Sequence, residues 1–288
     1  MSTKEITKNR RFLISLLVIF FSAAFAIGVH AIVPASVDFS KLDGILVKQF
    51  GFPIIAVSYF LILYIQCTFS VMFICNRTNV SNLQIGIRLG ISFALIYLVG
   101  MQEVVVESSP FSTYGFNFIK YQFFMGLGDA IPVIVLCIVI ALIAVKKYHK
   151  VPLIPHIKKA KNFYAIIIIT VGFLIERTIG YETGIINNNC DKYALPCYTW
   201  TVLFGIMLGS IYIILYPVLA KDSKRNRIPI RLLIIIGLNW IIFNSFIGLI
   251  MKGTMPQSLL RSGLDSIVLF IASSFIGRFV IKEDAPMT

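Results

Sequence analysis

The chain has 288 residues, of which 58% are hydrophobic and 14% charged, and its mean hydropathy is +0.87. A soluble protein of this size carries about a quarter charged residues, so the composition excludes an ordinary soluble domain. The net charge of +13 does not indicate a nucleic-acid-binding protein, because the basic residues lie in short stretches between long apolar segments.

Eight apolar segments follow one another along the chain, each close to the roughly 20 helical residues needed to cross a bilayer. They show no alternation of apolar and polar residues, the pattern of a membrane β-barrel, so we expect helices. The sequence predicts an all-α polytopic transmembrane helical bundle that forms a single integral membrane domain over residues 1–288. The expected spans are 12–33, 51–74, 89–107, 123–145, 163–182, 197–219, 232–251 and 264–281.

The first segment has a second interpretation. Basic residues precede it, so it could be a signal peptide cleaved after Ala31. The apolar part of a signal peptide usually has about 7–15 residues, and this run is longer. We therefore expect a retained transmembrane helix.

The basic residues outside the expected spans gather on one side of the membrane. They lie in both terminal tails and in the second, fourth and sixth connecting loops. The positive-inside rule then places both termini in the cytoplasm, with anionic lipid headgroups as partners of the basic loops. The bias toward Ile, Phe, Asn and Lys is typical of AT-rich genomes, which favours a bacterial cytoplasmic membrane, that is, a plasma membrane.

The longest basic loop suggests a division into two halves, 1–150 and 151–288, with four spans each. The last span of each half carries an aspartate near its start, Asp129 and Asp265, and a lysine follows each aspartate by 17 residues. Because four is an even number, a duplication would give parallel repeats related by an axis along the membrane normal.

Ionisable residues inside membrane helices are costly and often functional, and here they concentrate in the outer part of the expected spans. The candidate set is Glu103, Glu107, Asp129, Glu176, Asp265 and His30. These side chains would line an outward-facing acidic cavity that binds a cation, a proton or a cationic solute. Asp129 is the main candidate because it is the deepest and lies in a segment disturbed by glycines and Pro132.

A purely structural interpretation stays open for the same residues. Arg261 could pair with Asp265 one helical turn away, Arg177 with Glu182, and Glu176 with a basic residue on another helix. Glu103 and Glu107 could meet water at a helix end, and His30 could be an ordinary interfacial side chain.

Two of the five cysteines, Cys190 and Cys197, flank a short polar loop between membrane segments. If that loop faces an oxidising compartment, the two could form a disulfide; the alternative is a pair of free thiols. A zinc site is not expected, because the loop holds no histidine. We expect neither a metal nor a cofactor.

The chain lacks a zinc-binding HExxH pair, a GxSxG nucleophile elbow and a phosphate-binding GxxxxGK[ST] loop. The first functional hypothesis is a transporter or solute-binding protein. The second is a non-transporting scaffold, immunity factor or partner subunit that acts by helix–helix contact with an unidentified protein. The third is an intramembrane enzyme, which would need Asp129 and Asp265 close together.

Overall fold

The computed structural model describes residues 3–33, 42–106, 116–143, 159–220 and 227–280. Eight of the described helices are long and apolar enough to cross a membrane, which confirms the predicted all-α multi-pass bundle. Seven spans are formed by α1 (Thr3–Ile32), α3 (Phe52–Cys75), α4 (Asn82–Gly100), α5 (Phe116–Ile143), α6 (Lys159–Glu182), α7 (Ala194–Ala220) and α10 (Met255–Phe275). The remaining span joins α8 (Ile228–Leu232), the π-helix η4 (Leu233–Gly237) and α9 (Leu238–Ile250). Short elements are α2 (Ile45–Phe50), the 3₁₀-helix η2 (Met101–Val105) and the π-helix η5 (Ile276–Val280).

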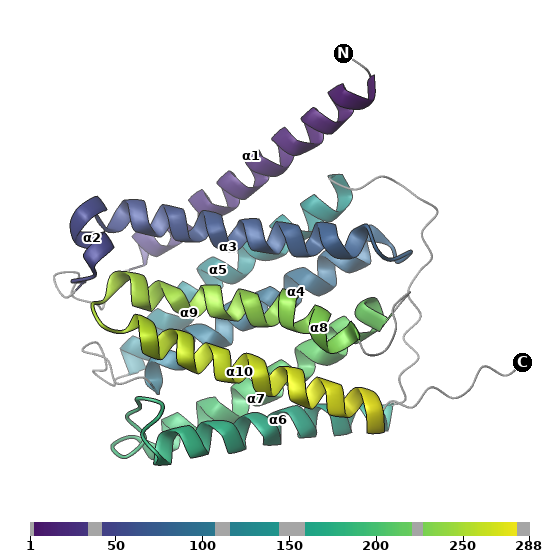
Figure 1. The fold of residues 1–288 in the computed structure, drawn as a ribbon. Coiled ribbons are helices and arrows are strands. Elements are labelled where there is room, and N and C mark those ends of the chain that lie inside the picture. The colour runs from purple at the N-terminus through teal and green to yellow at the C-terminus, as the bar shows by residue number, and fades with distance from the viewer. Residues whose placement is uncertain (1–2, 34–41, 107–115, 144–158, 221–226, 281–288) are drawn as a thin grey trace, which may run out of the picture.

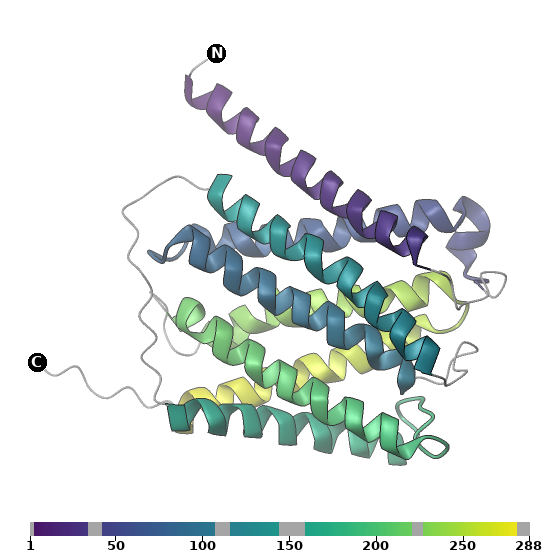
Figure 2. The same cartoon turned by 180° about the vertical axis from the view of Figure 1, so that it is seen from behind.

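The spans form two layers closed by a helix at each edge (Figures 1 and 2). One layer contains α3, α9 and α10, and the other contains α5, α4 and α7. Helix α1 packs on α3 and α5 at one edge, and α6 packs on α7 and α10 at the other. Within each half of the chain, the first span therefore contacts the second and the fourth, and the third contacts the fourth.

The bundle has an apolar surface and a partly polar interior. Large apolar side chains such as Phe21, Phe69 and Ile271 are more than half exposed, whereas Arg177, Asn239 and other polar residues are buried. A soluble protein would reverse this distribution, because water favours polar groups at the surface. The arrangement fits a lipid environment, where the polar groups must find partners inside the protein.

Several spans begin earlier than the hydropathy predicted, because they include basic residues expected in loops. Helix α4 begins at Asn82 and contains Arg88, whose Nη1 donates to the carbonyl oxygen of Ile214 at 2.7 Å. Helix α10 begins at Met255 and contains the buried Arg261. Each of these arginines has an acceptor or an anion within the protein, so a positive charge does not end the helix.

Glycines let two helix pairs approach closely. On α4, a Cβ atom at Gly86 would lie 2.8 Å from the carbonyl oxygen of Cys137 on α5, and one at Gly90 would lie 3.0 Å from the Cα atom of Ile134. Gly205 and Gly209 on α7 face α6 in the same way. Both pairs have the GxxxG spacing, which puts two glycines on one helix face and brings backbones together in membranes.

The π-helix η4 is stabilised by an amide network at the centre of the bundle. Its wider turn disturbs the usual backbone pairing, and Gln66 Nε2 on α3 donates to the carbonyl oxygen of Ile235 at 3.1 Å. Asn239 Nδ2 donates to Gln66 Oε1 at 2.8 Å and to the Tyr97 hydroxyl at 3.0 Å. The network joins α3, α4 and α9 where the two layers meet.

Replacing Gly86 with alanine should destabilise the bundle by about 1–3 kcal/mol, because the added methyl group overlaps the backbone of α5. Thermal unfolding in one detergent would measure the change. Gly28→Ala on α1 is the matched control, because a Cβ atom there meets nothing within 4 Å and alanine favours helix. Equal effects of the two substitutions would contradict the close approach of α4 and α5.

Candidate functional site

Arg177 on α6 is the centre of a buried charge cluster. Its Nε donates to Asp265 Oδ1 on α10 at 2.8 Å, and its Nη2 donates to Asp265 Oδ2 at 2.6 Å. The same Nη2 donates to Glu103 Oε1 on η2 at 2.8 Å. The Arg177 side chain is completely buried. One guanidinium group therefore binds two carboxylates from two other elements, with the two-point geometry that makes arginine–carboxylate pairs strong.

A second arginine and a tryptophan complete this cluster. Arg261, one turn before Asp265 on α10, places its Nε 3.0 Å from Glu103 Oε1. The indole Nε1 of Trp240 on α9 donates to Asp265 Oδ2 at 2.8 Å. Asp265 thus accepts three hydrogen bonds, two of them from Arg177, and Glu103 lies between two guanidinium groups. The cluster joins η2, α6, α9 and α10.

Glu176 adds a third carboxylate to the cluster. Its Oε2 lies 3.7 Å from Arg177 Nε, too far for a hydrogen bond. Among the described residues, neither oxygen of Glu176 accepts a hydrogen bond, and the buried Nη1 of Arg177 also has no acceptor. Three carboxyl groups therefore share the site with two guanidinium groups. The oxygens of Glu176 could still accept hydrogen bonds, and Nη1 of Arg177 could still donate one.

Aromatic rings surround the guanidinium group of Arg177. Its Cζ lies 5.2 Å from the ring centre of Phe173 and 5.4 Å from that of Trp200. Trp200 is held in turn by a 2.9 Å hydrogen bond from its Nε1 to the carbonyl oxygen of Val99. Aromatic faces attract a cation and exclude water, so they fix the position of Arg177 in the apolar interior.

A histidine–aspartate pair lies at the opposite edge of the bundle. His30 Nε2 on α1 lies 2.9 Å from Asp129 Oδ1 on α5, and Asp129 is almost completely buried. Gly128 allows this approach, because a Cβ atom there would lie 2.7 Å from Val29 on α1. In both halves, a nitrogen-containing side chain on the first span therefore contacts an aspartate on the fourth.

The sequence-predicted site residues fall into two groups. Glu103, Glu176 and Asp265 lie in the cluster around Arg177, while Asp129 and His30 form the pair on α1 and α5. Glu107 lies outside the described residues. The carboxylates are buried among protein groups, whereas the sequence interpretation placed them along an outward-facing cavity.

One ion pair considered from the sequence is wrong. Arg177 was a candidate partner of Glu182, but it binds Asp265 and Glu103, and Glu182 accepts a hydrogen bond from the Tyr198 hydroxyl at 2.9 Å. Arg261 forms an ion pair with Glu103 on another element, a partner that the i,i+4 spacing from Arg261 to Asp265 did not suggest. Helical spacing identifies neighbours on one helix, but here the carboxylates on other helices lie closer.

Sequence reasoning missed the central role of Arg177, Arg261 and Trp240. The signal was present, since an arginine five residues from the end of an apolar span is unusual and needs a buried anion. What the sequence did not give was the identity of that anion. Within the described part of the chain, no group of three or more His, Cys, Asp or Glu side chains is placed to hold a metal ion.

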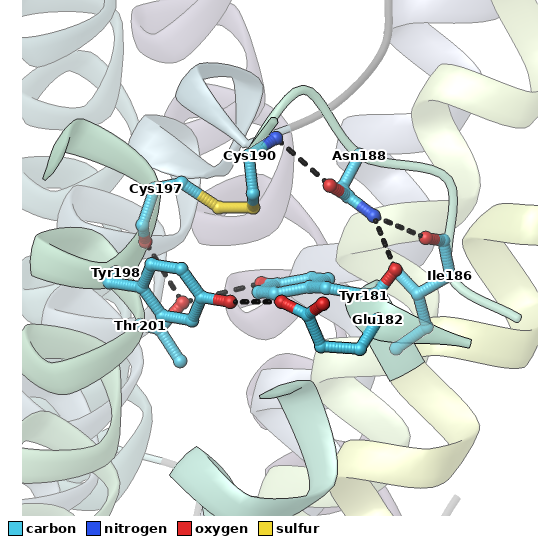
Figure 3. The surroundings of a disulfide bond; sticks show 8 residues. All are labelled: Tyr181, Glu182, Ile186, Asn188, Cys190, Cys197, Tyr198 and Thr201. Carbon is cyan, nitrogen blue, oxygen red and sulfur yellow. Dashed lines mark hydrogen bonds between the residues drawn. A yellow bond between two sulfur atoms is a disulfide. The ribbon is translucent and has the colours of Figure 1, made fainter. Parts of the chain in front are cut away.

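Cys190 and Cys197 form a disulfide in the connection between α6 and α7 (Figure 3). Nearby, the Tyr181 hydroxyl lies 3.3 Å from Thr201 Oγ1, four residues after Cys197 on α7. The loop lies at the end of the bundle where α6 ends and α7 begins, the same end as η2. The charge cluster is thus near the disulfide end, and the start of α1 and the end of η5 lie at the other end.

No protein-family model matches the chain, and no curated protein or solved structure is significantly similar to it.

Replacing Arg177 with methionine should destabilise the protein by about 3–5 kcal/mol, because Asp265 and Glu103 would remain buried without their shared cation. Thermal or denaturant unfolding in detergent would measure this loss. Arg278→Met on η5 is the control, since Arg278 is exposed. A loss no larger than that of the control would show that the ion pairs do not stabilise the fold.

Proposed function

We propose that this multi-pass membrane protein is a transporter or solute-binding protein that takes up a cation at the cluster around Arg177, and that the cation is a proton held by Glu176. The supporting observation is the imbalance of charge in the cluster. Glu103, Glu176 and Asp265 carry three carboxyl groups, and Arg177 and Arg261 carry two permanent positive charges.

The cost of burying charge favours a proton or another cation at this site. An uncompensated charge in the interior of a membrane protein costs several kcal/mol, so the cluster is most stable when its net charge is zero. Two carboxylates already bind guanidinium groups through hydrogen bonds, whereas neither oxygen of Glu176 accepts one within the described structure. Glu176 is therefore the carboxyl group at which one added positive charge balances the cluster.

The surroundings of Glu176 suggest how a proton would be held and released. Glu176 Oε2 lies 3.7 Å from Arg177 Nε, the same atom that donates to Asp265 Oδ1 at 2.8 Å, so both carboxyl groups approach one edge of the guanidinium group. With a proton, Glu176 donates to Asp265, and Asp265 keeps its position through Arg177 and Trp240. When the proton leaves, the two carboxylates repel one another and Glu176 turns away. Binding and release of a proton would thus change the contact between α6 and α10.

The charge and cysteine patterns support an assignment of the charge cluster to one face of the membrane. The disulfide belongs in an oxidising compartment, and the predicted basic loops belong at the cytoplasmic face with its anionic lipids. In the described part of the chain, the end of α3 next to Arg77 and the start of α8 next to Arg227 lie at the opposite end of the bundle from the disulfide (Figure 1). We place the charge cluster near the outer face of a bacterial cytoplasmic membrane, with both termini inside.

We also propose that the chain consists of two related halves, 1–150 and 151–288. The support is the matching set of helix contacts within each half, together with an aspartate on the fourth span of each that contacts a side chain of the first. In this arrangement, His30 and Asp129 correspond to Arg177 and Asp265. Asp129 has its own partner, so we assign the main proton site to Glu176 and a secondary site to Asp129.

One observation favours the scaffold or partner-subunit role. Arg177 joins α6 to both η2 and α10 through hydrogen bonds, so the cluster could serve only to lock the bundle in one arrangement. A scaffold of this kind needs neither proton exchange nor flux. The intramembrane enzyme has less support, because Asp129 contacts α1 whereas Asp265 contacts α6 and α9.

Glu176→Gln should remove the infrared absorption change of a buried carboxyl group when the purified protein is moved between acidic and alkaline buffer. It should also reduce proton flux into dye-loaded vesicles to the level of empty vesicles, because glutamine keeps the size of the side chain but cannot exchange a proton. Both measurements are made on the full chain, with elution and thermal unfolding as checks of folding.

Glu182→Gln is the matched control, because Glu182 lies on the same helix but is exposed. It should behave as the unsubstituted protein in both measurements. An infrared change and flux that survive in Glu176→Gln would contradict the proton site. An infrared change without any flux in the unsubstituted protein would contradict transport and favour the scaffold.

A further inference from the structure

The loop between α6 and α7, residues 183–193, is held by a disulfide and by several hydrogen bonds (Figure 3). The disulfide fixes Cys190 to Cys197 on α7. Asn188 orders the loop internally, because its Nδ2 donates to the carbonyl oxygens of Tyr181 and Ile186 and its Oδ1 accepts from the backbone N–H of Cys190.

Two contacts connect the loop to other parts of the bundle. The backbone N–H of Asn189 donates to the carbonyl oxygen of Val106, just after η2, at 2.9 Å. Gln257 on α10 forms two hydrogen bonds with the loop. Its Oε1 accepts from the backbone N–H of Asn187, and its Nε2 donates to the carbonyl oxygen of Ile185, each at 3.2 Å. The loop therefore has contacts with η2, α6, α7 and α10.

Each attachment lies about one turn from a charged residue of the cluster. Val106 follows Glu103 by three residues, Tyr181 follows Arg177 by four, and Gln257 precedes Arg261 by four. Four residues of α-helix rise about 6 Å, so the attachment points at Tyr181 and Gln257 lie about one turn along their helices from Arg177 and Arg261.

One apolar side chain of the loop packs against α6. Ile186 is completely buried, and its backbone N–H donates to the carbonyl oxygen of Gly180 at 2.9 Å. A Cβ atom at Gly180 would lie 2.6 Å from Ile186 Cδ1, so the glycine makes room for this side chain. Ile186 therefore packs against α6 at a position three residues after Arg177.

We propose that residues 184–189 form the outer gate of the charge cluster and that this structure shows the gate closed. Gly184, with a φ angle of +69°, lies at one end of the gate, and the disulfide anchors the other end at Cys190. When the gate opens, the two hydrogen bonds to Gln257 break and Ile186 moves out of its packed position. Water and protons can then reach Glu176. The assignment of Glu176 rests on the proposed function, whereas the gate itself rests on the loop contacts.

The gate is tested with a cysteine reporter beneath it. Ser258 is completely buried on α10, on the cluster side of Gln257 and one turn before Arg261. In the full chain in sealed, outside-out vesicles, Ser258→Cys should react slowly with a membrane-impermeant maleimide. Adding Gln257→Ala should accelerate the reaction about tenfold or more, because two hydrogen bonds that hold the gate are lost.

Two further variants sharpen this test. Gln49→Ala is the matched control, since Gln49 is an exposed glutamine on α2, and it should leave the labelling rate unchanged. Replacing both Cys190 and Cys197 with serine frees the second anchor and should also accelerate labelling. Elution profile and thermal unfolding establish that each variant is folded. If a folded Gln257→Ala variant and the folded double-serine variant both label at the original rate, the gate is overturned.

Maleimide labelling does not measure protons, so failure of the gate and failure of the proton site are distinguishable. Faster labelling in Gln257→Ala supports the gate even if Glu176→Gln leaves the infrared signal unchanged. Loss of the infrared signal in Glu176→Gln, together with labelling that neither Gln257→Ala nor the double-serine variant changes, would leave the proton site in place and overturn this loop as its gate.

Discussion

A buried guanidinium group organises this protein. Arg177 lies in an apolar helix, cannot lose its charge in a protein, and is fully removed from solvent. Such a group is tolerated only where carboxylates reach it, and Asp265 and Glu103 do so from α10 and η2. The packing of α6 at the edge of the bundle therefore depends on electrostatic pairing, because apolar side chains gain little by leaving lipid for protein.

The same constraint explains why polar contacts are distributed across the bundle. His30 and Asp129 connect α1 to α5 at one edge, the amide network of Gln66 and Asn239 lies in the centre, and the Arg177 cluster lies at the other edge. Between these contacts, glycines on α4 and α7 allow helices to approach closely. Polar pairs select which helices meet, and close backbone contact fixes how near they come.

The two ends of the molecule have different chemistry. At one end, a loop anchored by a disulfide contacts the elements that carry the charge cluster. At the other end, the spans begin and end near basic residues. The cluster combines permanent positive charges with one carboxyl group that has no hydrogen-bond donor in the described structure. This combination distinguishes Glu176 from Asp265 and Glu103, which both accept hydrogen bonds from Arg177.

The sequence by itself determined the fold class, the eight spans and the residues from which a polar site could form. Hydropathy over about 20 residues carries that information, because the bilayer sets the length of a helix. Hydropathy predicted the helix starts poorly at Arg88 and Arg261, since their partners belong to segments distant in sequence. Only the tertiary structure separated Asp129 from Asp265 and gave Arg177 its two carboxylates. The physical reason is that a buried charge is satisfied in three dimensions, by whichever helix brings an opposite charge within about 3 Å.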